Sequence, residues 1–237
     1  LFIKNVTKDE EKKMSVNLIA MLTNHDKTVP NAVEVFEENK GTKTNYWGFK
    51  DIGIELSEAK KLVERMKEEG KVTFLEPLVE SEEDCLKAAQ FAIDCKFEYM
   101  IGMEFYKSVA DKLKGTGIKY FPTCGKRAGI PRMLYGTCQE IIDDAKEILA
   151  CDGVEGICLS VYRYQDGDPE EMAMEFLKNV DSPMIITGSI GNDERLEFVK
   201  NLKPWGFTIG SALFDDSFGH YDKIADKIAA IMEKLEK

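Results

Sequence analysis

Two pairs of small residues, Gly188-Ser189 and Gly210-Ser211, each follow a short apolar run near the C-terminal end of the chain. Both runs are rich in β-branched and aromatic residues, which is typical of strands buried on both faces. At such strand ends, backbone N–H groups can approach a ligand without an intervening side chain, and they favour an anion. The two pairs therefore predict a phosphate-binding site made by the amides of Gly188, Ser189, Gly210 and Ser211.

Three charged residues stand where other predicted strands end, and we predict catalytic roles for them. Lys50 follows the predicted strand 45–49, where a lysine can bind an anion, polarise a carbonyl or, if desolvated, form a Schiff base with it. Glu76 and Glu104 follow the third and fourth strands, and two carboxylates near one lysine can divide acid and base roles. The alternatives are a solvated Lys50 paired with Asp51, and a Glu104 that caps the next helix.

The segment 125–132 carries the main basic cluster of an acidic chain, with Lys126 and Arg127 between two glycines. It predicts either a lid that closes over an anionic substrate or a solvated loop. Arg163, at the end of the sixth predicted strand, can add a bidentate contact to the substrate. His25 in the first polar corner can act as acid or base, or remain a surface residue. We predict that these four residues bind the substrate.

The elements that must position these residues repeat eight times as a short apolar run, a polar corner and an amphipathic helix. Strand starts recur at a mean of about 27 residues, and strands alternating with helices indicate βαβ units and a parallel sheet. Eight units predict a single-domain (β/α)8 barrel of the α/β class, with a doubly wound open sheet as the alternative. A barrel gathers all strand ends at one face, where sites are built.

Capping residues mark the starts of several predicted helices. Ser81 precedes a helix from about residue 82, and Thr137 with Glu140 forms a capping-box pattern. Asp168-Pro169 gives a cap followed by a proline at the first helical position. These signals fix helix starts directly after the predicted strand ends. The pattern also predicts a long polar segment over 126–136, a sixth strand over 154–161 and a last helix over about 221–236.

The composition limits the classes of function. The 237 residues, 43% of them hydrophobic, suit one barrel domain over 15–237, preceded by a mixed and charged extension over 1–14. The net charge of −11 argues against nucleic-acid and anionic-membrane binding. No apolar run approaches the roughly 18 residues that cross a bilayer. We expect a soluble cytoplasmic protein, and barrels of this size leave a homodimer open.

The six cysteines include no Cys-x-x-Cys pair and accompany only two histidines, so we predict neither a structural zinc site nor another metal site. No cofactor is expected either. Cys124 lies beside Gly125, Lys126 and Arg127, where a thiolate would be stabilised. The alternative is a small residue at a turn.

The two Gly-Ser corners resemble those of the phosphate-binding (β/α)8 barrels, the superfamily of ribulose-phosphate epimerase, the tryptophan and histidine biosynthetic barrels and thiamin phosphate synthase. In that group the seventh strand ends in a Gly pair and the eighth in Gly-Ser or a near equivalent, and their amides hold the substrate phosphate. The resemblance implies the same role for Gly188, Ser189, Gly210 and Ser211, with Ser189 in place of the commoner second glycine.

A narrower resemblance rests on the segments 46–53, 74–76 and 207–214. They look like an uncharacterised bacterial family of small barrels, some of whose members are labelled 4-hydroxythreonine-4-phosphate dehydrogenase. True members of that enzyme family bind their metal with histidines, of which this chain has only His25 and His220.

These residues together predict an enzyme that stabilises a carbanion or enolate on a small phosphorylated carbonyl compound, as an aldolase-like lyase or an isomerase. A metal-assisted epimerase that uses Asp51, Glu76 and Glu104 is the alternative enzyme. Some barrels of the superfamily resemble antitermination regulators that sense a phosphorylated metabolite and bind RNA, which the net charge disfavours. A phosphate-binding barrel without activity is the remaining alternative.

Overall fold

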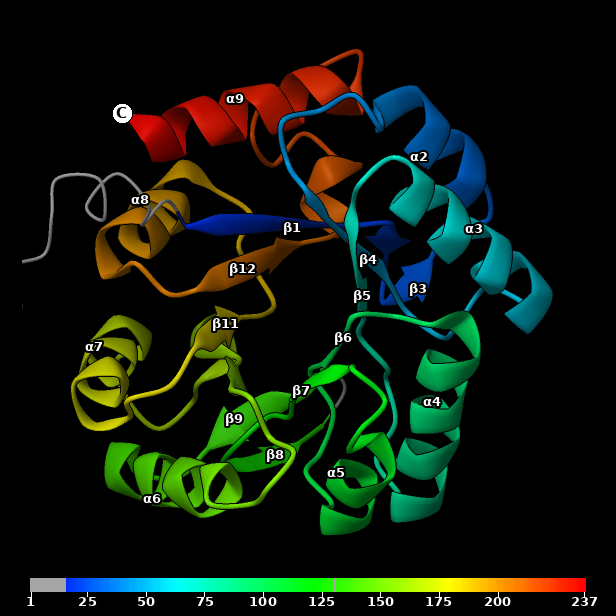
Figure 1. Cartoon of the computed structure of the whole chain (residues 1–237). Coiled ribbons are helices and arrows are strands. Elements are labelled where there is room, and N and C mark those ends of the chain that lie inside the picture. The colour runs from blue at the N-terminus through cyan, green and yellow to red at the C-terminus, as the bar shows by residue number, and fades with distance from the viewer. Residues whose placement is uncertain (1–15, 130) are drawn as a thin grey trace, which may run out of the picture.

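A computed structural model describes residues 16–129 and 131–237 of the chain (Figure 1), so the predicted extension over 1–14 lies outside the described residues. Within these described residues, eight parallel strands form the centre, and eight helices surround it. The strands are β1 (Asn17–Met21), β4 (Tyr46–Phe49), β5 (Val72–Leu75), β6 (Tyr99–Ile101), β7 (Lys119–Phe121), β10 (Ile157–Leu159), β11 (Met184–Ile186) and β12 (Gly206–Ile209). The helices are α2 (Ala32–Asn39), α3 (Leu56–Glu68), α4 (Glu82–Cys95), α5 (Lys107–Leu113), α6 (Cys138–Leu149), α7 (Pro169–Asn179), α8 (Asp193–Leu202) and α9 (Ile224–Glu236).

The sheet closes on itself, which confirms the predicted (β/α)8 barrel and rules out the doubly wound open sheet. Its strand order is β10-β11-β12-β1-β4-β5-β6-β7, and parallel bridges then join β7 to β10. The Cys158 N–H donates to the Pro122 carbonyl at 2.8 Å across this seam. A closed sheet has no free edge and gathers its eight strand ends at one face.

Alternate residues of each strand face the inside of the barrel, as the pleat requires. Inward side chains such as Ile19, Phe74 and Tyr99 form an inner cluster, while Trp47 and Phe49 point outward against the helices. Gly48 faces inward, where a Cβ would lie 2.8 Å from the Phe74 Cβ. Its successor in the alternation, Lys50, therefore faces the barrel mouth.

Helix starts follow the predicted capping residues. The Ser81 hydroxyl accepts from the Asp84 N–H at 3.2 Å, and Thr137 with Glu140 forms the capping box of α6. The Asp168 carboxylate accepts from two N–H groups in the first turn of α7. Each cap satisfies N–H groups that have no partner within the helix.

Four local details differ from the sequence prediction. The first polar corner forms a two-residue hairpin, β2 (Thr23–Asn24) with β3 (Lys27–Thr28), because its central residues adopt left-handed backbone angles. The polar segment 126–136 contains a hairpin of β8 (Lys126–Ala128) and β9 (Met133–Tyr135). The sixth strand is shorter than the predicted 154–161, since the chain turns into the 3-10 helix η1 (Val161–Arg163). The last helix begins at Ile224 rather than near residue 221.

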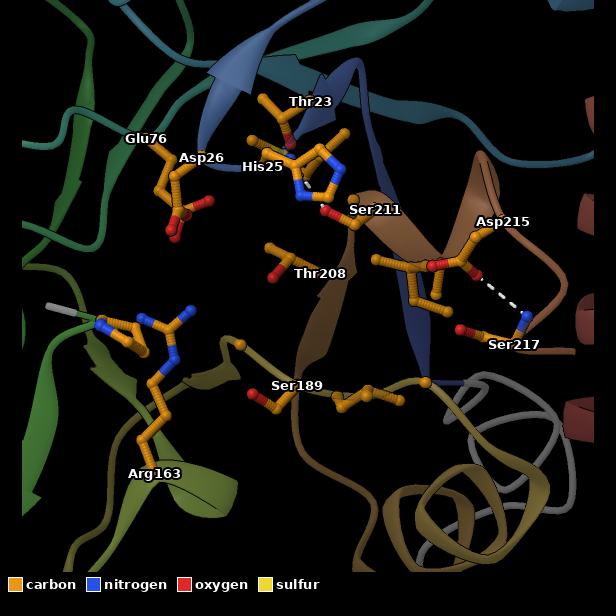
Figure 2. Close-up of a pocket in the computed structure, with 18 of the residues that line it drawn as sticks. Thr23, His25, Asp26, Glu76, Arg163, Ser189, Thr208, Ser211, Asp215 and Ser217 are labelled. Carbon is orange, nitrogen blue, oxygen red and sulfur yellow. Dashed lines mark hydrogen bonds between the residues drawn. The ribbon is translucent and has the colours of Figure 1, made fainter.

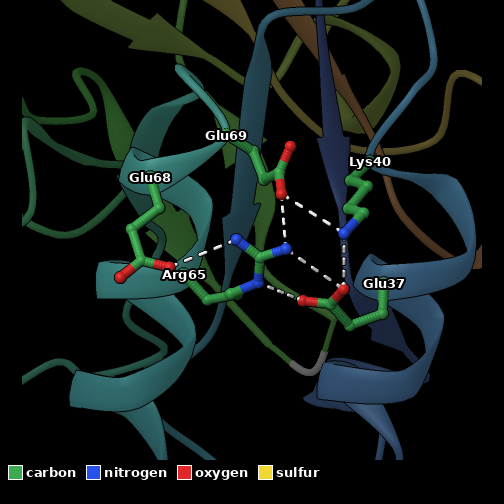
Figure 3. Close-up of polar contacts among 5 residues, drawn as sticks. All are labelled: Glu37, Lys40, Arg65, Glu68 and Glu69. Atoms are coloured by element: carbon green, nitrogen blue, oxygen red, sulfur yellow. Dashed lines mark hydrogen bonds and ion pairs between the residues drawn. The ribbon is translucent and has the colours of Figure 1, made fainter.

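Figure 3 shows a charged network on the outer surface between α2 and α3. The Arg65 guanidinium pairs with Glu37 at 2.5 Å, with Glu68 at 3.2 Å and with Glu69. Lys40 reaches Glu37 at 2.9 Å and Glu69 at 3.2 Å. Salt screens ion pairs at the surface, so these contribute little to stability. None of the five residues lines the pocket described below.

Among the described helices, none has the length and apolar composition needed to cross a membrane.

Candidate functional site

A pocket of about 500 Å³ opens at the C-terminal ends of the barrel strands (Figure 2). Eight of the eleven residues predicted from the sequence line it: His25, Lys50, Glu76, Arg163, Gly188, Ser189, Gly210 and Ser211. They come from strand ends far apart in the sequence, which only the closed barrel brings together. The remaining three, Glu104, Lys126 and Arg127, do not line this pocket.

The corner after β11 presents free backbone donors to the pocket. In the described part of the chain, the amides of Gly188 and Ser189 donate no hydrogen bond to another backbone group. Both residues have left-handed backbone angles, with φ of +78° at Gly188 and +63° at Ser189. A serine in this region is strained, and such strain concentrates at functional sites. The corner can therefore offer adjacent N–H groups to an anion.

The corner after β12 is held from the other side by the β2–β3 hairpin. The Ser211 hydroxyl accepts from the His25 N–H at 3.1 Å, and a Cβ on Gly210 would lie 2.6 Å from the Thr23 Oγ1. The 3-10 helix η2 (Ser211–Leu213) follows directly. Gly210 thus allows the close approach of two strand ends, and the Ser211 hydroxyl locks them together.

Lys50 lies between two carboxylates at the mouth of the barrel. Its Nζ is 3.6 Å from the Asp26 Oδ1 and 3.7 Å from the Glu76 Oε2, and its side chain is 7% exposed. The backbone is fixed by Thr28, whose hydroxyl accepts from the Lys50 N–H at 3.0 Å and donates to the Lys50 carbonyl at 2.7 Å. Lys50 is thus a buried, positioned cation, not the solvated lysine of the alternative interpretation.

The Glu76 side chain continues the inward face of β5 and packs over Gly102. A Cβ on Gly102 would lie 2.9 Å from the Glu76 Cγ, so a glycine there leaves room for the carboxylate. The Glu76 side chain is 17% exposed, compared with 42% for Asp26. Of the two carboxylates beside Lys50, Glu76 is therefore the better shielded from water.

The Arg163 side chain extends into the pocket from η1 and crosses the face of Gly188 (Figure 2). A Cβ on Gly188 would lie 2.8 Å from its Nε and 3.2 Å from its Cζ. The Nε is buried without a hydrogen-bond partner, and no carboxylate of the described residues lies within 4.0 Å of the guanidinium. Buried donors are normally paired, so this guanidinium is available to an anionic ligand.

A second arginine, Arg195 of α8, lines the pocket beside the same corner. Its Nη1 donates to the Ser189 carbonyl at 2.5 Å, and its Cζ lies 4.4 Å from the centre of the Tyr162 ring. Burial is the main factor that raises the pKa of Tyr162, and its hydroxyl donates to Glu170 at 3.1 Å. Tyr162 therefore packs against Arg195 and does not line the pocket.

The basic residues of the β8–β9 hairpin do not line this pocket. Of the described residues in the hairpin, Pro131 does line it. The Arg127 Nε lies 3.8 Å from the Glu104 Oε1, and its Nη1 donates to the Thr123 hydroxyl at 2.5 Å. Burial lowers the pKa of Arg127. Arg127 and Glu104 thus contact each other beside the barrel end, and neither lines the pocket.

Lys126 lines a separate cavity of about 420 Å³ on the helix side of the hairpin. That cavity also contacts Glu140 and Asp144 of α6. The Asp144 carboxylate accepts from the Gly125 N–H at 2.6 Å, which ties the start of the hairpin to the helix. Lys126 therefore lies outside the pocket that holds Lys50.

Cys124 is buried and Asp51 is half-buried, and neither lines the pocket. Cys124 is 2% exposed, and burial raises the pKa of its thiol, so the alternative of a small residue at a turn holds instead of a reactive thiolate. Burial also raises the pKa of Asp51, whose carboxylate accepts from the Leu78 N–H at 3.3 Å. Among the described residues no three histidine, cysteine or acidic side chains gather as metal ligands do, so Asp51, Glu76 and Glu104 form no such set.

The pocket residues that the sequence prediction missed include Asp26, Thr208 and Arg195. Asp26 adopts a φ of +60° in the β2–β3 turn. Glycine is the usual sequence signal for such a turn, and this turn contains none. Thr208 faces inward on β12, two residues before Gly210, and alternation along the strand would have found it. Arg195 lies on the first turn of α8, and nothing in the sequence marks its approach to the corner.

Comparisons with known protein families and with curated protein sequences find no match to this chain. Solved structures match its fold. N-(5'-phosphoribosyl)anthranilate isomerase from Pyrococcus furiosus is similar with a TM-score of 0.64 at 13% identity, over 93% of this chain and 98% of that chain. The N-acetylmannosamine-6-phosphate 2-epimerase from Clostridium perfringens is similar with a TM-score of 0.60 at 15% identity, over 83% and 86%.

A glycerol uptake operon antiterminator regulatory protein from Listeria monocytogenes is similar with a TM-score of 0.55 at 13% identity, over 89% of this chain and 96% of that chain. At these identities the likeness establishes the barrel fold alone. The narrower resemblance to proteins labelled 4-hydroxythreonine-4-phosphate dehydrogenase finds no support in these comparisons.

Proposed function

We propose that this chain is an enzyme that acts on a small phosphorylated carbonyl compound through a carbanion or enolate. The observation that carries the proposal is the shared pocket, which both the two Gly-Ser corners and the Lys50–Glu76 pair line. Enzymes named for phosphorylated compounds occur among the barrels of similar fold, which is consistent with the proposal.

The phosphate would bind at the corners after β11 and β12. The amides of Gly188, Ser189, Gly210 and Ser211 face it from the backbone, and the unpaired Arg163 guanidinium completes the site. Each N–H to a charged oxygen contributes on the order of 1.5 to 3 kcal/mol. This end of the substrate is held and does not react.

The carbonyl would lie near Lys50. β1 alone separates β12 from β4 in the sheet, so two strand spacings, about 10 Å, divide the corner from Lys50. A short carbon chain spans that distance. The geometry therefore suits a small sugar phosphate or a related compound better than a large substrate.

The chemistry assigned to this end divides between two side chains. The Glu76 carboxylate takes a proton from the carbon next to the carbonyl, and the electron pair moves onto the carbonyl oxygen. The Lys50 ammonium stabilises that oxygen, or its amine holds the carbon as a Schiff base. Asp26 lies on the other side of Lys50 and keeps it in place. Proton return to the former carbonyl carbon gives an isomerase. In a lyase, Glu76 would instead take the proton of the hydroxyl on the second carbon from the carbonyl; the bond between that carbon and its neighbour breaks, its electron pair forms the enolate, the hydroxyl carbon leaves as an aldehyde, and the enolate is then protonated.

Deuterium exchange tests the proposal without knowledge of the full reaction. A panel of triose, tetrose and pentose phosphates is incubated with the protein in D2O, and NMR follows the C–H beside the carbonyl. We expect exchange with at least one compound and its loss in Lys50→Met and Glu76→Gln. Exchange should be retained in Lys27→Met, which changes an exposed lysine of the β2–β3 hairpin. Absence of exchange across the panel would refute carbanion chemistry on these compounds.

Borohydride trapping separates the two roles of Lys50. A mass gain that depends on Lys50 supports the Schiff base, and exchange without a mass gain assigns Lys50 to electrostatic stabilisation.

A sensor without catalysis is the second candidate, favoured by the fold shared with the antiterminator regulatory protein. Such a protein would bind the phosphorylated compounds, show no exchange with any of them, and bind them equally well after Lys50→Met.

A further inference from the structure

A buried lysine lies directly behind the corner after β12. Lys227 of α9 is 3% exposed, and its ammonium donates to the carbonyls of Ala212 at 3.4 Å, Leu213 at 3.3 Å and Asp215. These carbonyls belong to η2 and the turn that follows it, so one side chain fixes the whole segment after Gly210-Ser211.

The ammonium of Lys227 forms no ion pair within the described part of the chain. No carboxylate of the described residues lies within 4.0 Å of its Nζ, and its hydrogen-bond acceptors are backbone carbonyls. The Asp215 side chain belongs to the same turn, and its carboxylate accepts from the Ser217 N–H at 2.9 Å instead. Burial of an ion without a counter-ion is costly, and a neutral side chain could hold the same carbonyls. The buried positive charge is therefore left without a direct ion pair, and an anion bound at the corner would be attracted to it.

We infer that Lys227 is a positioning residue whose buried positive charge makes the phosphate site selective for dianions. The inference rests on the proposed phosphate site. The three residues of η2 rise about 2 Å each, which with one hydrogen-bond length places the ammonium about 9 Å from an anion at the corner. At an effective dielectric constant of about 20, this attraction changes affinity by on the order of tenfold per unit of anion charge.

The chain offers a matched control. Lys71 is also buried, at 8% exposure, and its ammonium donates to the carbonyls of Thr42 at 3.1 Å and Thr44 at 3.0 Å. Burial lowers the pKa of Lys71. It precedes β5 and therefore lies at the opposite end of the barrel from the pocket. Its replacement has a similar structural cost without changing the field at the corner.

The test is calorimetric titration of methyl phosphate into the wild type, Lys227→Gln, Lys227→Arg and Lys71→Gln. Glutamine keeps a donor for the carbonyls and removes the charge, whereas arginine keeps the charge. Titrations at about pH 8 and about pH 5.5 present the ester mainly as a dianion or a monoanion, since its second pKa is near 6. Each variant is compared with the wild type at the same pH, which cancels other titrations in the pocket.

We expect Lys227→Gln to weaken binding by on the order of a hundredfold for the dianion and tenfold for the monoanion. Lys227→Arg should retain most of the affinity, and Lys71→Gln should bind like the wild type. An equal loss at both pH values would assign Lys227 a structural role only, and no loss beyond that of Lys71→Gln would also overturn the inference. A wild type that binds no methyl phosphate would overturn the phosphate site itself, and this inference with it.

Discussion

The contact between Gly188 and Arg163 gives a quantitative prediction for the phosphate site. A Cβ at position 188 would lie 2.8 Å from the Arg163 Nε, the tightest contact around this glycine. Because the obstructing atom belongs to a long, flexible side chain, Gly188→Ala should displace the guanidinium instead of unfolding the barrel. The left-handed φ of +78° adds a strain of about 1 to 2 kcal/mol to the alanine variant.

The magnitude for binding follows from the lost guanidinium. A hydrogen bond to a charged group contributes about 1.5 to 3 kcal/mol, so Arg163→Met should weaken phosphate binding by roughly ten- to a hundredfold. Gly188→Ala should cause a similar loss, because it moves the same group away. The double variant should then bind no more weakly than either single variant, since both substitutions remove one interaction.

The assay is a double-mutant cycle of inorganic phosphate binding by calorimetry, with urea denaturation of each variant to measure the cost in stability. Ser189→Ala serves as the control at the neighbouring position, because it keeps the backbone amide and the space around Arg163. Additive losses in the double variant would refute a shared origin. Unchanged phosphate affinity in Gly188→Ala would show that Arg163 does not need its position next to Gly188 to bind phosphate.

Three further predictions concern residues around the site and in the scaffold. Ser189→Gly should stabilise the protein by about 1 kcal/mol in urea denaturation while it leaves phosphate binding unchanged, because glycine adopts the φ of +63° without strain. Thr137→Ala should lower the free energy of unfolding by about 1 kcal/mol, since it breaks the capping box of α6; an unchanged value would contradict that role. Because burial raises the pKa of Asp51, its protonated form favours the fold, and this contribution is lost as pH rises from about 4 through the raised pKa. Asp51→Asn should therefore remove part of the fall in stability with pH, and an unchanged slope would refute the burial effect.

Alternation along the strands explains why part of the site could be predicted from the sequence. On β4, Tyr46 and Gly48 face the inside of the barrel, so Lys50, two residues further on, also faces inward at the barrel mouth. On β5, Phe74 faces inward, and Glu76 two residues later therefore does so too. The Gly-Ser corners followed from two apolar runs that end in small residues. In each case the position depends on the strand itself, which a local pattern describes.

The residues that the sequence misplaced depend on irregular backbone. Glu104 and Arg127 end in contact with each other because the segment after β7 folds into a hairpin that turns Arg127 toward the barrel wall. Asp26 reaches Lys50 only through a two-residue turn with left-handed angles, and Arg195 reaches its corner from a helix. Strand alternation and helix periodicity do not predict these contacts, because the contacts depend on how separate segments pack in three dimensions.

The distribution of charge within the pocket determines which way a phosphorylated ligand would lie. Lys50 has two carboxylates within 4.0 Å, so that end of the pocket carries a net negative charge around its cation. Arg163 and Arg195 lie at the corner after β11, and in the described part of the chain neither guanidinium has a carboxylate within that distance. A phosphate dianion is therefore attracted to the corner and repelled from the Lys50 end, even though Lys50 is itself a cation. The uncharged carbonyl is left to face Lys50 and Glu76, which is the orientation that the proposed proton transfer requires.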